Sequence, residues 1–381
     1  MLEARVASDL TVRRDVELLL RCVDRVELLA AIRGAGIDAL IVAGHPPWLD
    51  PQCVSESAGR GIRIVGLSDA GAPLGATSVL GSDASIDEIV EACRNAAPAI
   101  PATSSPPDRN GRLVAVWGPK GSPGRTRVAI ELAYELEGSS ASCMLLDADP
   151  FGGDVIQTLG ILDELPTLVW AARQAAHGDL DEEQILRYLR KPEGGPAIIP
   201  GLPRGDLWAD VSHFGFTELL MVVRGIAGHT IVDAGFCLEP ASSNLDADEG
   251  RHRMTRTAIR EADSVVAVLR ADPLGLKNFL WAFESLTELV DPDQVSVVAN
   301  RVTEGDERRV AEIVKRHTGK RPLAYLPDVP DLASAAVRNG APIGGMKGAG
   351  GYRAAVQSLS IAVGARLRPK GVLTRLAGPS R

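Results

Sequence analysis

The residues best suited to chemistry lie in two stretches in the middle of the chain. Residues 114–126 read VAVWGPKGSPGRT, and residues 144–150 read MLLDADP. A strand that passes through a glycine-rich turn into a helix gathers backbone N–H groups at the positive end of that helix. Acids at the end of a neighbouring strand are typical ligands of the Mg²⁺ and water that accompany a nucleotide. The two stretches therefore predict a phosphate-binding site.

Two later apolar runs also end in polar residues. Residues 230–235 read TIVDAG, with Asp233 at the end of the run, and residues 297–301 read VVANR, with Asn300 in that place. In a parallel sheet the carboxyl ends of the strands lie along one edge, where ligands bind. Asp233 is therefore expected near the phosphate loop.

The block at residues 120–126, KGSPGRT, resembles the deviant Walker A motif of the MinD/ParA family, K-G-G-x-G-K-[ST]. The resemblance covers residues 111 to about 364. With the receiver-like segment that precedes it, the chain is most similar to the CpaE/TadZ branch, whose members are pilus-assembly or polar-localisation ATPases. The resemblance implies ATP and Mg²⁺ as cofactors and an ATP-dependent homodimer.

The resemblance also assigns roles within the loop. Lys120 falls on the signature lysine that reaches across the dimer to the partner's phosphates, and Thr126 falls on the Mg²⁺-binding hydroxyl. The other expected nucleotide contacts in the loop are Gly121, Ser122, Gly124 and Arg125.

Further roles fall on the strand ends. Asp147 and Asp149 match the D-x-D of the second strand, and Asp149 would orient the attacking water. Asp233 matches the Walker B acid, so the implied metal ligands are Thr126, Asp147 and Asp233. Asn300 matches an adenine-contacting residue, and Pro327 lies in the matching late proline loop.

The loop departs from the family motif in three places. Pro119 replaces the first glycine, Ser122 replaces a loop glycine, and Arg125 replaces the P-loop lysine. Arginine neutralises phosphate, but its planar fork is wider than the compact ammonium of lysine. We therefore expect slow turnover, and a pseudo-ATPase scaffold is the alternative.

Each of these residues also has an ordinary structural explanation. Glycine turns between strands and helices are common, Lys120 could be a solvated surface charge, and Asp147 and Asp149 could cap a helix. Asp233 could be a plain loop acid. The order of the motifs along the chain favours the nucleotide site.

Composition limits the classes of protein. The 381 residues carry a net charge of −8, which gives no overall basic footprint for nucleic acid. The cysteines show no CxxC pair, and the histidines show no ligand spacing. No secretory leader or membrane-length apolar run is evident. We expect a cytoplasmic protein, with a polar or peripheral inner-membrane position as a further option.

Residues 111–365 predict a P-loop NTPase domain with a mostly parallel, doubly wound α/β sheet. The expected strands are residues 113–117, 143–146, 197–199, 230–232, 265–269 and 295–299. The expected helices are residues 126–136, 217–226, 274–289 and 307–317. Residues 163–190 are predicted to be a helical insertion or cap.

Residues 1–95 predict a flavodoxin-like domain that resembles a degenerate response-regulator receiver. Strands are expected at residues 4–7, 37–43, 62–67 and near 79–80, with helices at 12–22 and 86–93. The position of the phospho-accepting acid holds Ala43-Gly44-His45 instead, so a role in protein contacts or localisation is favoured over phosphorylation.

The remaining segments join or extend these domains. Residues 96–110 have the composition of a Pro/Ser/Ala-rich linker. The basic tail, residues 366–381, offers at most weak peripheral contact with a membrane. The run at residues 251–256, RHRMTR, is expected either to contact an anionic partner or to be a solvated helix start.

The sequence therefore predicts a MinD/ParA-like dimerisation switch that serves a pilus-assembly or cell-division apparatus through a protein partner. Besides the pseudo-ATPase scaffold, a partition factor that binds nonspecific DNA is the remaining alternative. Salt-sensitive, ATP-dependent retention on DNA would distinguish that role.

Overall fold

The computed structural model describes residues 2–366 apart from residues 35, 45, 47, 48, 50, 70, 99–110, 122, 140, 141, 163, 164 and 241–249. These residues form two compact units that divide near residue 107. The predictions for Ser122, most of the linker and the tail after residue 366 lie outside the described residues.

The C-terminal domain is built on a seven-stranded sheet in which every neighbouring pair is parallel. The strands, in chain order, are β4 (Arg112–Trp117), β5 (Cys143–Ala148), β6 (Ala197–Ile199), β7 (His229–Ala234), β8 (Ser264–Arg270), β9 (Val295–Val302) and β10 (Ala324–Pro327). Their spatial order is β10-β9-β8-β4-β7-β5-β6. This confirms the predicted α/β class and all six expected strands, and it adds β10, which was expected only as a loop.

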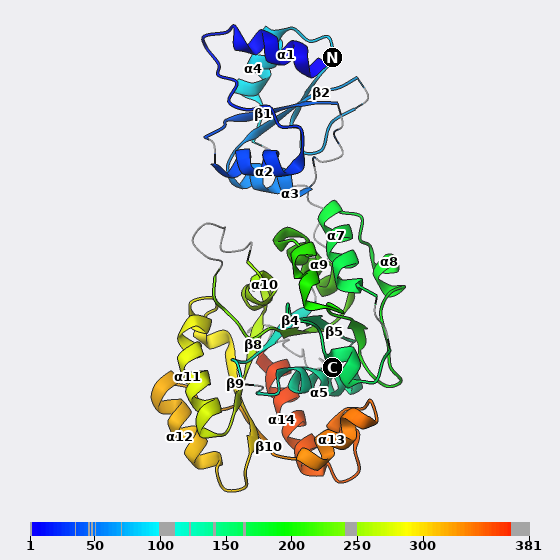
Figure 1. The fold of residues 1–381 in the computed structure, drawn as a ribbon, viewed down its shortest axis with the longest axis vertical. Coiled ribbons are helices and arrows are strands. Elements are labelled where there is room, and N and C mark those ends of the chain that lie inside the picture. The colour runs from blue at the N-terminus through cyan, green and yellow to red at the C-terminus, as the bar shows by residue number, and fades with distance from the viewer. Residues whose placement is uncertain are drawn as a thin grey trace, which may run out of the picture. The chain divides into compact units, whose positions relative to one another are not determined.

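Helices cover both faces of this sheet (Figure 1). The longer ones are α5 (Arg125–Gly138), α7 (Thr167–His177), α9 (His213–Ile226), α10 (Arg253–Glu261), α11 (Pro273–Thr287), α12 (Glu307–Thr318), α13 (Pro330–Arg338) and α14 (Gly350–Arg366). Short helical turns, α6 (Val155–Thr158) and α8 (Glu182–Leu186), lie between them. No helix in the described ranges is long and apolar enough to cross a membrane.

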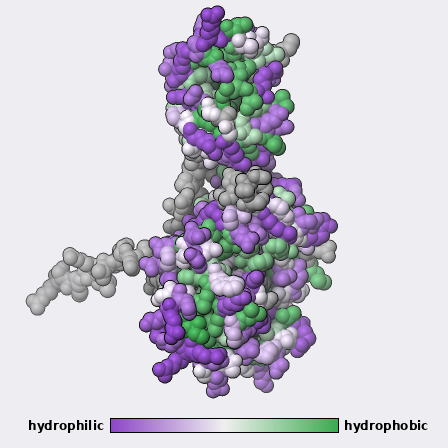
Figure 2. Space-filling view, turned by 60° about the vertical axis from the view of Figure 1, so that its left-hand side comes forward, coloured by the Kyte–Doolittle hydropathy of each residue, from purple (hydrophilic) through white to green (hydrophobic). Residues whose placement is uncertain are grey.

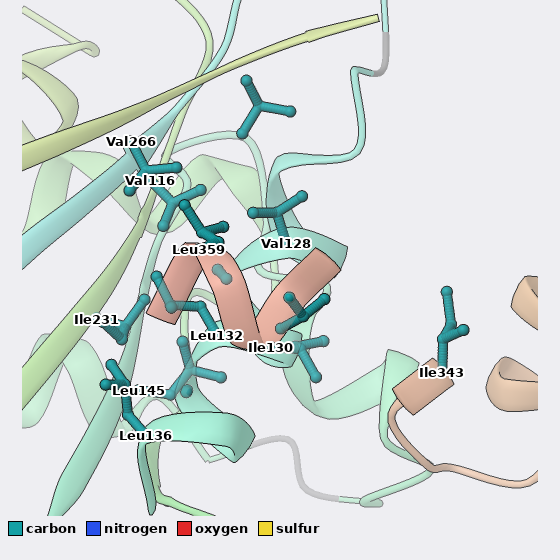
Figure 3. Close-up of a cluster of buried hydrophobic side chains, with 14 of the residues drawn as sticks. Val116, Val128, Ile130, Leu132, Leu136, Leu145, Ile231, Val266, Ile343 and Leu359 are labelled. Carbon is teal, nitrogen blue, oxygen red and sulfur yellow. The ribbon is translucent and has the colours of Figure 1, made fainter. Parts of the chain in front are cut away.

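The central strand, β4, explains why the core has two sides. Val114 and Val116 pack with α5 and α14, whereas Leu113, Ala115 and Trp117 pack with the helices of the other face. Figure 3 shows Val116, Leu132 and Leu359 in one cluster, contributed by β4, α5 and α14 respectively. A strand covered on both faces must be apolar throughout, as the sequence of β4 is. The core therefore fixes the strand that leads into the glycine-rich loop.

The N-terminal domain contains a smaller parallel sheet in the order β1-β2-β3. Its elements are α1 (Leu2–Thr11), α2 (Arg25–Gly34), β1 (Ala39–Ala43), α3 (Pro51–Gly59), β2 (Arg63–Leu67), β3 (Ser78–Leu80) and α4 (Ile86–Asn95). The strands expected near residues 37–43, 62–67 and 79–80 and the helix expected at 86–93 are present.

Two other predictions for this domain are wrong. Residues 4–7 belong to helix α1 and not to a strand, because Val6 and Leu10 have helical spacing and both are buried. Residues 12–22 form no helix. Val16 and Leu18, two positions apart, both pack against the core around Leu67, a spacing that suits extended chain and not a helix. The described residues of this domain therefore contain three strands where the flavodoxin-like pattern requires five.

Candidate functional site

The glycine-rich loop connects β4 to α5 and depends on glycine at three positions. Gly121 and Gly124 have φ values of +100° and +91°, a region that side chains disfavour. A Cβ on Gly118 would lie 2.5 Å from the carbonyl oxygen of Val268. The loop can therefore keep this path only with glycine at these positions.

Two side chains from outside the loop hold its tip. Asn278 on α11 donates its Nδ2 hydrogen to the carbonyl oxygen of Lys120, at 3.2 Å. Arg270, at the end of β8, donates from Nη1 to the carbonyl oxygen of Gly121, at 3.3 Å. These two contacts hold the loop tip from outside the loop. Neither residue was predicted from the sequence, where Arg270 ends an apolar strand and Asn278 lies in the helix that follows it.

Asn300 holds the loop from another strand. Its Nδ2 donates to the carbonyl oxygen of Pro123 at 2.7 Å, and a Cβ on Gly124 would lie 2.3 Å from that nitrogen. Asn300 is only 6% exposed. In this structure the residue expected to contact adenine therefore fastens the loop, and its contact with the base stays a prediction.

Arg125, which replaces the P-loop lysine, is already engaged. Its Nη1 donates to the carbonyl oxygen of Gly118 at 3.0 Å, and its Nη2 lies 3.2 Å from Oδ2 of Asp149. Both side chains are largely buried, at 15% and 17% exposure. The guanidinium also lies 5.8 Å from the ring centre of Phe236. A bound phosphate would have to compete with this ion pair for Arg125.

Thr126 and Asp233 meet at the start of α5. Thr126 lies near the Asp233 carboxylate and lowers its pKa, while Oδ1 of Asp233 is buried without a hydrogen-bond partner. Burial and the neighbouring Asp147 raise the pKa of Asp233 well above its ordinary value. An orphaned carboxylate oxygen beside a hydroxyl is a donor set that fits Mg²⁺, which uses few protein ligands and completes its shell with phosphate and water. Among the described residues no three His, Cys, Asp or Glu side chains form a metal site.

Asp147 lies beside Asp233 on the neighbouring strand but faces a different loop. Its two oxygens accept hydrogen bonds from the backbone N–H groups of Asp149, at 3.2 Å, and Val155, at 3.1 Å. A Cβ on Gly153 would lie 2.5 Å from Oδ2 of Asp147. These contacts favour a role in anchoring the loop that carries Asp149, whereas the predicted role as a metal ligand is untested.

Burial gives Asp147 a pH dependence that can be measured. Desolvation raises its pKa from the ordinary 3.8 to about 7, so the folded state binds its proton more tightly than the unfolded state does. Its contribution to stability is therefore present at low pH and is lost as the pH rises toward 7. Without Mg²⁺, the stability of Asp147→Asn relative to wild type should rise between about pH 5 and 7, by up to about 1.4 kcal/mol per pH unit.

Urea unfolding of both proteins at several pH values measures this difference. Asp293→Asn, which removes an exposed carboxylate, is the matched control and should show no such trend. Parallel pH profiles for wild type and Asp147→Asn would contradict the assignment.

The structure places the last two predicted residues at the edge of the site. Lys120 is exposed, with no ion-pair partner among the described residues. Pro327 ends β10, next to β9 and the strand-end residue Asn300. A pocket of about 410 Å³ lies at the ends of β8 and β9, where Arg301 has a φ of +55°. Arg270, which contacts the loop, is one of the residues that line this pocket.

The basic run at residues 251–256 is not a solvated helix start. Arg253 and Arg256 are 5% and 8% exposed and donate to backbone carbonyls, those of Val211 and Leu238 among them. Arg251 is half-buried and stacks 4.1 Å above the ring centre of Phe151. The structure therefore removes two of the three arginines from the surface at which an anionic partner was expected.

Several solved structures of other proteins share this architecture. No family model and no curated protein matches the sequence. Among solved structures, a ParA family ATPase from Chlorobium tepidum matches with a TM-score of 0.56 at 13% identity, over 66% of this chain and 98% of that one. The cell division ATPase MinD from Pyrococcus furiosus matches with a TM-score of 0.52 at 16% identity, over 67% and 99%.

A third match is the septum site-determining protein MinD from Pyrococcus horikoshii, complexed with Mg-ADP. Its TM-score is 0.51 at 17% identity, over 66% of this chain and 96% of that one. About two thirds of this chain therefore has the fold of the MinD/ParA-type P-loop ATPases.

Proposed function

We propose that this chain is an ATP-binding switch of the MinD/ParA type, which hydrolyses ATP slowly and dimerises when ATP is bound. The proposal rests on the position of Thr126 beside the Asp233 carboxylate, one oxygen of which is buried without a hydrogen-bond partner. Both residues lie at the end of a loop whose carbonyl oxygens accept hydrogen bonds from Arg270, Asn278 and Asn300. Such a loop at a helix start suits a phosphate, and the pair suits the accompanying metal. The solved structures of Mg-ADP and AMPPNP complexes with this fold support the choice of ligand.

In the proposed reaction, water displaces ADP from the γ-phosphorus. Thr126 and Asp233 would hold Mg²⁺, which when bound neutralises phosphate charge. Arg125 would turn from Asp149 to the phosphates, which frees the Asp149 carboxylate to orient the attacking water. Arg125 and Lys120 would stabilise the charge that develops on the phosphoryl oxygens.

Dimerisation would bring Lys120 of one copy to the nucleotide of the other. The exposure of Lys120 supports this, because an unpaired ammonium is available for a second molecule. A solved MinC:MinD complex from Aquifex aeolicus, with a TM-score of 0.50, is an example of this fold bound to a protein partner. For this chain we propose a partner in a pilus-assembly or cell-division apparatus, in line with the CpaE/TadZ resemblance.

A pseudo-ATPase scaffold is the second candidate, favoured by the ion pair between Arg125 and Asp149. That pair engages both residues in the absence of nucleotide. If it is stronger than the contact with phosphate, the chain would bind nucleotide weakly and act through its fold alone. For the DNA-binding alternative, burial of Arg253 and Arg256 removes two of the expected contacts.

Two substitutions separate binding from turnover. Asp149→Ala should keep ATP binding but reduce hydrolysis by about 100-fold, because positioning of the attacking water is lost. Lys120→Ala should keep binding by the single chain but lose ATP-dependent dimerisation. Phosphate release and light scattering measure these effects. Turnover in Asp149→Ala at the wild-type rate would contradict the assigned role.

A further inference from the structure

The N-terminal domain contains a cavity of about 990 Å³ between β1 and the extended residues 16–23. We call this cavity the β1 slot. Its walls are mostly apolar and include Val6, Leu10, Leu18, Leu20, Ile41 and Val42. Figure 2 shows hydrophobic residues at the surface of this domain, in the upper part of the view. The slot is independent of the nucleotide site.

One wall of the slot is an unpaired strand edge. β1 pairs with β2 alone among the described strands. The N–H of Arg63 donates to the carbonyl oxygen of Asp38, and the N–H of Gly44 donates to that of Leu67. Because backbone groups alternate along a strand, residues 39, 41 and 43 direct their N–H and C=O groups into the slot. An unpaired edge of this kind is a template for another strand.

The opposite wall is also extended and unpaired. Within the described part of the chain, no backbone–backbone hydrogen bond joins residues 14–22 to β1 or to any other segment. Leu19, Leu20 and Val23 are 45%, 57% and 67% exposed. Unpaired backbone and exposed apolar side chains therefore face the same space from both sides. A further strand could therefore pair with the free edge of β1.

The chemical groups in the walls indicate which kind of molecule could bind in the β1 slot. A lipid or other apolar small molecule would cover the side chains but leave the backbone N–H and C=O groups unpaired, which is costly. Four of the charged groups that line the slot form pairs, with Arg21 2.9 Å from Glu3 and Arg94 2.8 Å from Asp15, so these four need no counter-charge. Glu17, Asp38 and Arg63 also line the slot. A strand covered on both faces is apolar throughout.

We propose that the β1 slot binds an extended, uncharged, apolar β-strand of a partner protein. The inserted strand pairs with residues 39, 41 and 43 of β1 and spans the five residues of that strand. The N-terminal domain is then a peptide-docking module, and strand addition completes its sheet.

Hydrogen exchange in the full-length chain tests this proposal. The probe is an amidated peptide with the core Val-Ile-Val-Ile-Val, flanked by two lysines at each end for solubility. In the protein alone, the amides of residues 39, 41 and 43 should exchange fast, whereas those of 40 and 42 should be protected by β2. The peptide should slow exchange at 39, 41 and 43 by about tenfold or more. A peptide with proline at its centre should have no effect, because proline cannot pair.

Matched variants locate the contact. Leu20→Lys places a charge in the slot and should weaken peptide binding by about tenfold or more. Val26→Lys changes an exposed residue that does not line the slot and should leave binding unchanged. Protection of residues 39, 41 and 43 in the protein alone would mean that its own chain fills the slot, and would overturn the proposal. The proposal would also be overturned if the proline peptide bound as tightly as the probe peptide, or if the probe peptide bound Leu20→Lys as tightly as wild type.

Discussion

Asp233→Asn is expected to abolish magnesium-dependent nucleotide binding while leaving the protein folded and more stable. The Asp233 carboxylate is fully buried beside Asp147, so its charged form is costly in the absence of a metal. Asparagine has nearly the same shape as aspartate but provides no charge for Mg²⁺. Affinity for Mg-ATP should fall by about 100-fold, which corresponds to about 3 kcal/mol.

The same substitution should raise the free energy of unfolding at pH 8, without Mg²⁺, by about 1–3 kcal/mol. Calorimetry with Mg-ATP and urea unfolding measure the two effects on the same protein. Asp154→Asn is the control, because Asp154 is exposed on the neighbouring loop and loses the same charge. A variant that binds Mg-ATP as wild type does would show that Asp233 has no part in the site.

Arg125→Lys is expected to increase both nucleotide affinity and turnover. In wild type the guanidinium must leave Gly118 and Asp149 before it can meet a phosphate. A lysine ammonium is compact and cannot contact two acceptors in the same fork geometry, so it competes less with the nucleotide. Kd should fall and kcat should rise, each by about tenfold, or about 1.4 kcal/mol.

Arg127→Lys is the matched control for this result. Arg127 lies on the same helix turn, but its Nη1 contacts the carbonyl oxygen of Ala341 and lies 3.7 Å from Glu131. Its replacement should leave nucleotide affinity unchanged. Weaker binding by Arg125→Lys would mean that the arginine fork is itself the phosphate ligand, and the ion pair with Asp149 would then not limit turnover.

The C-terminal fold could be predicted because the middle residues of its strands are mostly apolar. The strands β4, β5, β7, β8 and β9 are covered on both faces, and their polar residues lie mainly at or near the strand ends. β10 was missed because its four residues include a proline and lie at the sheet edge. The position of the loop followed directly from the strand before it and the helix after it.

Contacts between distant segments could not be read from the sequence. Asn278 and Arg270 meet the loop from about 150 positions away, and neither belongs to a motif. Arg253 and Arg256 read as surface charges, yet backbone carbonyls from other segments surround them. In the N-terminal domain, Val16 and Leu18 pack on the core in extended chain despite a helical pattern in the sequence. Local propensity is a weak guide where tertiary partners compete with it.

We infer that the two domains of this chain have separate roles. The C-terminal domain would respond to nucleotide, and the N-terminal domain would bind a partner strand through the β1 slot. The two activities can be tested separately, since Leu20→Lys affects only the slot and Asp233→Asn only the nucleotide site.

Calorimetric titration of the full-length chain with ATP, with and without Mg²⁺, tests whether this chain binds nucleotide through Mg²⁺. We expect saturable binding that depends on Mg²⁺ and is lost in Asp233→Asn, because Thr126 and Asp233 lie where the metal would bind. The absence of any binding at millimolar ATP, with Mg²⁺ present, would contradict it.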